Sequence, residues 1–250
     1  MIWLRSLIFQ ILFLSWTAFV STCYSPLLLG PVHKRTRIAT FWCRGTMWLL
    51  DRIVGLSYEV IGREHCPATP AIYAIKHQSA WETIAVCDLF SNFCLVVKQE
   101  LMRIPMFGLH LSRMGFIGID RAAGASALKK LVRQGRKVHA DGLDIVMFPE
   151  GTRTPPGTRQ PYHAGIAALY RDLGVQVVPV ALNSGLFWGR RSLFKRPGCI
   201  TVQFLPPIAP GLRRKEFMAA LEDSIETATD ALLASPASVA PREKLSTVLE

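Results

Sequence analysis

Short runs of β-branched and apolar residues alternate with longer helical segments from Tyr58 onward, and this alternation constrains the fold more than any other feature. Runs of this length, bounded by turn residues, are typical of strands, whereas the longer segments are typical of helices. The predicted strands are 58–61, 71–75, 94–97, 116–119, 145–148, 175–181 and 200–204. The predicted helices are 80–90, 123–140, 165–172 and 213–233. Such alternation indicates an α/β fold, in which helices cover a mixed, mainly parallel sheet.

The N-terminal part of the chain is apolar and carries almost no charge. Between Arg5 and His33 lie 27 residues without a charged side chain, rich in Leu, Ile, Phe and Trp. About 20 apolar residues are enough to cross a bilayer as a helix, and this run is too long for a signal peptide. Pro26 and Gly30 interrupt it, and a second apolar segment follows at 38–50. We therefore expect a membrane anchor, formed either by one spanning helix or by two helices that dip into one leaflet.

The overall charge limits the classes of partner. Basic residues exceed acidic ones by 11, which favours anionic partners such as lipid headgroups or phosphorylated substrates. No zinc-finger, RRM-like or KH-like motif is present, so nucleic acid is the weaker partner class. The six cysteines form none of the closely spaced pairs typical of metal sites. This pattern argues against a zinc site and a disulfide framework, and it favours a reducing compartment.

Charge also orients the chain relative to the membrane. The basic run at 33–37 outweighs the single Arg5. By the positive-inside rule, the bulk of the chain then lies on the cytoplasmic side of the inner membrane. We divide the chain into a membrane-anchoring helical segment (1–55), a catalytic domain (56–235) and a flexible tail (236–250).

A histidine and an acid stand close together where a strand gives way to a helix. His77 follows the apolar run 71–75, and Glu82 comes five residues later, in the first turn of the predicted helix. A neutral imidazole within reach of a carboxylate can take a proton from a hydroxyl. Because residues five apart on a straight helix do not share a face, the pair meets only if His77 lies in the turn before the helix. Ser79 and Glu82 also fit a capping box, so Glu82 has two candidate roles.

A second polar motif, 148–153, follows the buried run 145–148. It therefore lies at the carboxyl end of a strand, where α/β sheets bind ligands. Gly151 lets the backbone approach a ligand, Thr152 offers a hydroxyl, and Arg153 can grip a phosphate through two parallel N–H donors. From its residues the motif is a candidate for binding a phosphate, and the alternative is an exposed turn with a solvated ion pair.

Four segments together resemble the sequence blocks of the glycerolipid acyltransferase family, in the family's order. They are 77–82, 115–121, 148–153 and 177–180. The resemblance extends over 58–207, with Glu82 standing where the family has an aspartate. It implies the fold of that family, O-acyltransferase activity, and chemistry that needs no metal and no bound cofactor.

The resemblance also implies roles for single residues. His77 would be the general base and Glu82 the acid that orients it. The residues expected to bind substrate are Lys98, Asp120, Arg121, Glu150, Gly151, Thr152 and Arg153. His163 stands where many relatives have a lysine, which leaves the headgroup of the acceptor open.

The implied reaction transfers a fatty acyl group from acyl-CoA or acyl-carrier protein to the free hydroxyl of a lysophospholipid, with lysophosphatidate giving phosphatidate as the leading case. The hydroxyl attacks the thioester directly, because no cysteine has a nucleophile context and no G-x-S-x-G elbow is present. Backbone N–H groups near the first and third blocks would stabilise the oxyanion. An acyltransferase for another lyso-lipid, such as lyso-ornithine lipid, and a catalytically silent lipid-binding membrane protein are the alternatives.

Overall fold

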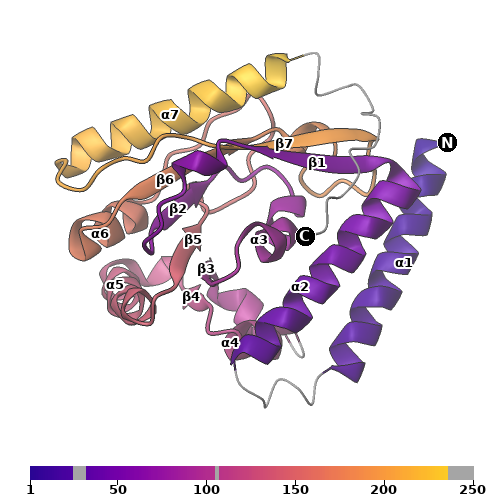
Figure 1. The fold of residues 1–250 in the computed structure, drawn as a ribbon, viewed down its shortest axis with the longest axis horizontal. Helices are drawn as coiled ribbons and strands as arrows, with labels where there is room; N and C mark the ends of the chain where they lie inside the picture. Colours follow the sequence, from indigo (N-terminus) through magenta and orange to yellow (C-terminus); the bar gives the residue numbers. More distant parts are fainter. Residues whose placement is uncertain (25–31, 105–106, 236–250) are drawn as a thin grey trace.

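A seven-stranded sheet forms the centre of the computed structural model, which describes residues 1–24, 32–104 and 107–235. The strand order is β1-β7-β6-β2-β5-β3-β4, and every neighbouring pair is parallel except β6 and β7. The strands are β1 (Leu56–Ile61), β2 (Ile72–Ile75), β3 (Phe93–Lys98), β4 (Ile117–Ile119), β5 (Asp144–Met147), β6 (Val177–Leu182) and β7 (Gly198–Phe204). All seven predicted strands and the mainly parallel sheet are thus confirmed (Figure 1).

The central strands are buried on both faces, which explains their apolar sequences. Every residue of β2 and β6 is buried, as expected for parallel strands covered by helices on both sides. One face packs against α5 (Gly124–Ala140), α6 (Ala164–Leu173) and α7 (Arg214–Ala234). Along α5 the buried residues Ala127, Leu131, Gly135 and Val138 recur at helical spacing. An added Cβ at Gly135 would lie 2.5 Å from a methyl carbon of Leu169 in α6, so glycine permits this close approach.

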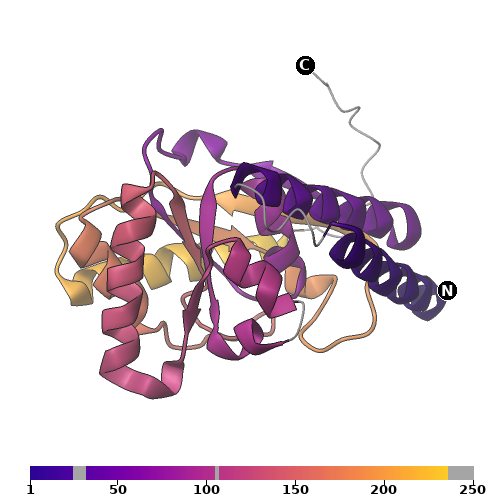
Figure 2. The same ribbon diagram turned by 90° about the horizontal axis from the view of Figure 1, so that it is seen from below.

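The other face is covered by α3 (Trp81–Leu89) and by an N-terminal helical hairpin, as Figures 1 and 2 show. A short helix, α4 (Phe107–Arg113), follows the 3-10 segment Gln99–Arg103 and was not predicted from the sequence. Its seven residues are too few to show a clear helical period. The four longer helices predicted for the domain are confirmed within a few residues at each end.

The hairpin consists of α1 (Ile2–Cys23) and α2 (Val32–Leu49), and α2 continues as a π-helical turn, Leu50–Val54. The indole N–H of Trp16 donates to the carbonyl of Trp42 at 3.0 Å, and the indole N–H of Trp42 donates to Thr17 Oγ1 at 3.0 Å. Among the described helices, only α1 is both long enough and apolar enough to cross a membrane. A single such helix is weak evidence for a span. The apolar N-terminal helix expected from the sequence is therefore present.

The hairpin packs on the sheet domain through both of its helices. Phe9 meets the ring of Trp188 edge-on at 5.8 Å between centroids. In α2, Arg44 pairs with Asp88 of α3 at 3.0 Å, which accounts for the single charge inside the second apolar segment. The predicted tail at 236–250 lies outside the described residues.

Candidate active site

His77 lies in the turn between β2 and α3, as the spacing required. Its Nδ1 is 3.1 Å from Oε1 of Glu82. The imidazole stacks on the ring of Phe148 at 4.0 Å between centroids and 18° between planes. His77 also lines the large cavity described below, and its side chain is 12 % exposed. The stacking and the hydrogen bond fix both the position and the orientation of the ring.

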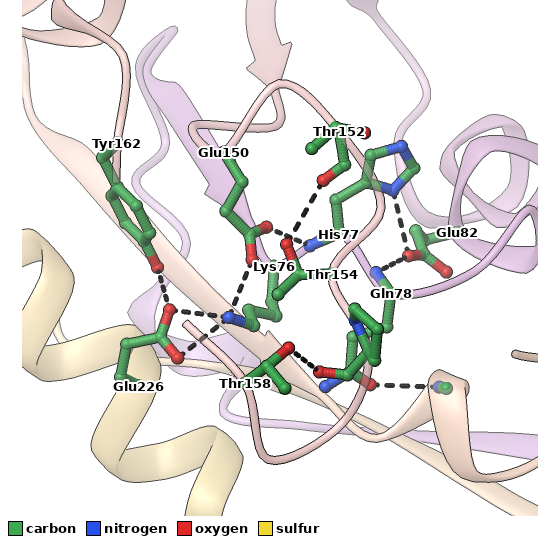
Figure 3. A network of polar contacts seen from close by, with 12 residues as sticks. Lys76, His77, Gln78, Glu82, Glu150, Thr152, Thr154, Thr158, Tyr162 and Glu226 are labelled. Carbon is green, nitrogen blue, oxygen red and sulfur yellow. Dashed lines mark hydrogen bonds and ion pairs between the residues drawn. The ribbon is translucent and has the colours of Figure 1, made fainter. Parts of the chain in front are cut away.

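Glu82 is fully buried and bonds both the imidazole of His77 and the turn before α3 (Figure 3). Its Oε1 accepts the backbone N–H groups of Gln78 and Ser79 in addition to its contact with His77. Its Oε2 accepts the hydroxyl of Ser184, which lies just after β6, at 2.9 Å. The N-cap of α3 is Ala80, which has no side-chain cap, so the capping box predicted for Ser79 and Glu82 does not form at the helix end. One carboxylate instead holds the turn before α3 and contacts the imidazole.

Three backbone N–H groups of the first motif are engaged inside the protein. The N–H of His77 donates to Oε2 of Glu150 at 2.7 Å, while those of Gln78 and Ser79 donate to Glu82. None of these three groups is left for an oxyanion.

A buried charge network lies directly beneath His77 (Figure 3). Nζ of Lys76 is 2.7 Å from Oε1 of Glu150 and 2.6 Å from Oε1 of Glu226 in α7. The hydroxyl of Tyr162 donates to the same oxygen of Glu226 at 2.9 Å. Burial raises the pKa of Glu150, and the Lys76 ammonium opposes that rise. The Glu150 carboxylate thus faces the interior, where its partners are Lys76 and the backbone of His77, instead of the cavity.

A cavity of about 1230 Å³ opens beside the imidazole. Apolar side chains from α1, α2, α3, β3, α4 and α5 form most of its wall. The predicted residues that line it are His77, Lys98, Gly151, Thr152 and Arg153. Arg190 and Arg191, from the segment between β6 and β7, add two further cations to the same wall. The cavity therefore combines a large apolar surface with several cationic side chains.

The remaining predicted residues of the second block lie at the edge of this cavity. Asp120 is exposed, and its carboxylate accepts the backbone N–H of Ala122 at 3.0 Å. Arg121 begins the 3-10 turn Arg121–Ala123, and its side chain lies outside the described part of the chain. Ile119 on one side of the turn lines the cavity. Asp120 thus caps a turn that follows a cavity-lining strand.

Sequence reasoning missed the residues that support the pair from a distance. Ser184 and Glu226 follow Glu82 by 102 and 144 residues, and no local pattern connects them to it. Lys76 adjoins His77, but its sequence gives no sign that the ammonium is buried. The adjacent Arg190 and Arg191 were the one visible signal, because paired cations near a phosphate motif suggest an anionic ligand.

One cysteine thiol also lines the cavity. Burial raises the pKa of Cys87 to about 12, so its thiol is protonated at neutral pH. Because the thiolate is the nucleophilic form, Cys87 does not offer a covalent route for acyl transfer.

Comparison with known proteins places this site in a family. A family model described as acyltransferase matches residues 57–183. The chain is 38 % identical over 208 residues to a 1-acyl-sn-glycerol-3-phosphate acyltransferase of Pseudomonas aeruginosa, a match that covers 81 % of this chain and 80 % of that protein. The chain belongs to the acyltransferase family.

More distant acyltransferases agree with this assignment. A 1-acyl-sn-glycerol-3-phosphate acyltransferase of Limnanthes alba is 30 % identical over 73 % of this chain, which spans 65 % of the plant protein's length. The crystal structure of the 1-acyl-sn-glycerophosphate acyltransferase of Thermotoga maritima superposes with a TM-score of 0.77. That match covers 94 % of this chain and 99 % of the other at 18 % identity, so it shows a shared fold.

The family match also separates two parts of this acyltransferase. It includes His77, Glu82, Lys98 and Arg153. It excludes the hairpin, α7 and the segment that carries Arg190 and Arg191. These outlying parts nevertheless line the cavity or support His77.

Proposed function

We propose that this acyltransferase transfers a fatty acyl group from acyl-CoA or acyl-carrier protein to the free hydroxyl of 1-acyl-sn-glycerol 3-phosphate, giving phosphatidate in phospholipid biosynthesis. The observation that carries the proposal is the position of His77, which is bonded to Glu82 and lies in the wall of a cavity lined by cationic and by many apolar side chains. The activities named for the Pseudomonas and Limnanthes relatives support this choice of acceptor.

In the proposed mechanism, His77 takes the proton of the acceptor hydroxyl. Its Nδ1 faces the Glu82 carboxylate and carries a proton there, which leaves Nε2 as the basic nitrogen. As the hydroxyl oxygen attacks the thioester carbon, its proton moves to Nε2 and Glu82 stabilises the imidazolium. The new C–O bond forms, the C–S bond breaks, and the proton on His77 passes to the departing sulfur. A thiol with a pKa of about 8.5 is a good leaving group, so no stronger acid is needed.

Basic side chains on the cavity wall would hold the acceptor's phosphate. Arg153 and Lys98 both line the cavity that opens beside His77, and the guanidinium of Arg153 can form two parallel bonds to one phosphate. The apolar remainder of the wall suits fatty acyl chains, because burying each methylene contributes about 0.8 kcal/mol. The site requires no metal or bound cofactor for these steps, since the histidine supplies the base and the thioester supplies the activated acyl group.

The hairpin would bring this site to the membrane by dipping into one leaflet. Trp3, Leu7, Ile11 and Phe19 of α1 are exposed. Yet α1 contacts the domain through Phe9 near one end and lines the cavity near the other. A helix fixed alongside the domain in this way would carry polar domain surface into the bilayer if it crossed both leaflets. We therefore favour insertion into the cytoplasmic leaflet of the inner membrane, with the catalytic domain in the cytoplasm.

The deciding experiment assays the detergent-purified protein with a panel of lyso-lipids and both donors. The panel holds lysophosphatidate, lysophosphatidylcholine and lyso-ornithine lipid, each with acyl-CoA and acyl-carrier protein, and His77→Ala is the inactive control. We expect turnover of lysophosphatidate above the other acceptors. Preference for lyso-ornithine lipid would replace the proposed acceptor, and no turnover with any pair would indicate a silent lipid-binding protein.

A further inference from the structure

The segment between β6 and β7 exposes two large apolar side chains at its tip. We call residues 187–197 the β6–β7 loop. Leu193 is 71 % exposed and Phe194 is 57 % exposed. Among the described residues, Leu193 is more exposed than any other large apolar side chain except Met1. Exposure of two adjacent apolar side chains to water is unfavourable, and such pairs often mark a contact surface.

The tip of this loop is fastened to α1. The backbone N–H of Lys195 donates to Oγ of Ser6 at 2.9 Å, and Nζ of Lys195 donates to Oε1 of Gln10 at 3.0 Å. The Lys195 ammonium lies 5.1 Å from the ring centroid of Phe9 and 4.7 Å from that of Trp188. Leu193 and Phe194 are therefore held beside the N-terminal half of α1, whose own outer side chains are apolar and exposed.

Cations flank the apolar pair on both sides. Arg190, Arg191 and Arg196 are all exposed. Apolar side chains between exposed arginines are typical of segments that lie in the membrane interface, where the apolar groups insert and the cations meet anionic headgroups. The loop is thus continuous with the hairpin in position and complementary to an anionic lipid surface in charge.

We propose that the β6–β7 loop is a third membrane-contacting element, which inserts Leu193 and Phe194 into the same leaflet as the hairpin. The proposal rests on the one-leaflet insertion proposed above and extends it to a separate part of the chain. Because Arg190 and Arg191 also line the cavity, insertion of the loop tip sets the cavity wall at the level of the lipid phosphates. A lysophospholipid can then move from the leaflet into the cavity without crossing water.

The test measures the depth of single labelled positions. In a Cys23→Ser background, which removes the exposed native cysteine, Phe194→Cys carries an environment-sensitive fluorophore. Phe19→Cys on the hairpin is the positive control, and Leu212→Cys, before α7 and exposed, is the matched negative control. The full-length protein is reconstituted into vesicles of phosphatidylcholine and phosphatidylglycerol with nitroxide-labelled acyl chains, and aqueous iodide serves as the opposing quencher.

The proposal predicts nitroxide quenching and iodide protection at positions 194 and 19, with the reverse at position 212. Quenching at 19 but not at 194 overturns the loop contact and leaves the anchoring hairpin standing. Quenching at neither position refutes the membrane anchoring and the loop contact together. If acyl-carrier protein shields the label at 194 in detergent solution without vesicles, the loop binds the acyl donor and the proposal is wrong.

An activity measurement tests the consequence for catalysis. The double variant Leu193→Ser/Phe194→Ser lacks the two apolar side chains that would be buried in the bilayer. We expect about a tenfold loss of activity on vesicles. Activity in detergent micelles should match that of the wild type, because neither side chain is placed in the catalytic machinery. Leu212→Ser is the matched control. Unchanged activity on vesicles contradicts the proposal. An equal loss in both media contradicts it too, because the two side chains would then act without a bilayer.

Discussion

Glu82 bonds both the turn before α3 and the imidazole of His77 through one buried carboxylate, and substitution can separate the two contacts. In Glu82→Gln, the amide oxygen can still accept the N–H groups of Gln78 and Ser79, and the amide nitrogen can donate to Ser184. The negative charge opposite His77 is lost. We expect thermal unfolding within a few degrees of wild type and a loss in turnover of about tenfold or more. Glu82→Asp should retain substantial activity, and full activity of the Gln variant would leave Glu82 with only the role of holding the turn before α3.

Arg153 offers a second test at the scale of a single side chain. A lysine at this position keeps the charge but cannot form two parallel bonds to a phosphate. We expect Arg153→Lys to raise the KM for lysophosphatidate nearly as much as Arg153→Ala does, with a smaller effect on kcat. Initial rates across acceptor concentration give both constants. Equal losses with an acceptor that lacks the phosphate would instead indicate a structural role.

At the scale of elements, α7 supports the turn that carries His77. The path runs from Glu226 in α7 through Lys76 to Glu150, whose carboxylate accepts the N–H of His77. This network contains two carboxylates for one ammonium, all buried. Lys76 is the one cation of the network and offsets the negative charge of both carboxylates.

This balance predicts unequal effects at the two ends of the network. Lys76→Met leaves two buried carboxylates facing each other, and we expect it to destabilise the fold by about 3–5 kcal/mol. Glu226→Gln keeps an acceptor for Lys76 and Tyr162 and leaves a neutral pair, so its cost should be much smaller. Lys130→Met, which removes a less buried ammonium bonded to Gln99, is the matched control. Chemical denaturation in detergent measures all three, and equal destabilisation by the first two variants would contradict the network.

The contact between α1 and the β6–β7 loop should depend on pH. Burial lowers the pKa of Lys195 from 10.5 to about 8. Between these values the unfolded chain holds the proton that the folded chain has released, so stability rises with pH by up to about 1.4 kcal/mol per unit. Buried tyrosines and cysteines, whose pKa values burial raises, make stability fall as pH rises. That effect is the same in the wild type and in a Lys195 variant. We therefore expect Lys195→Met to lose this gain, and an unchanged pH dependence of the unfolding free energy would refute it.

At the scale of the whole molecule, the apolar surface of the hairpin should dominate membrane attachment. The charge of +11 adds an electrostatic attraction that salt screens, whereas burial of apolar side chains is insensitive to salt. We expect the protein to stay with membranes in high salt and in a carbonate wash, measured by sedimentation. Release by salt alone would show that only the basic surface holds it.

The sequence by itself determined the fold class, the seven strands and the position of His77 before a helix. These features are encoded locally, because a strand buried on both faces needs a continuous apolar run and a helix needs its own period. The resemblance to the family pointed to His77, Glu82, Lys98 and Arg153. The structure places three of them in the wall of one cavity, with Glu82 bonded to His77.

Only the tertiary structure decided where the side chains point. Glu150 adjoins Gly151 in the sequence, yet its carboxylate faces the interior because Lys76 and the N–H of His77 lie there. Glu226 supports the site from a helix 150 residues after Lys76. No local sequence pattern can indicate a contact across so long a separation. The direction of a side chain at a strand end is set by partners from other elements, and those partners meet only when the sheet has assembled.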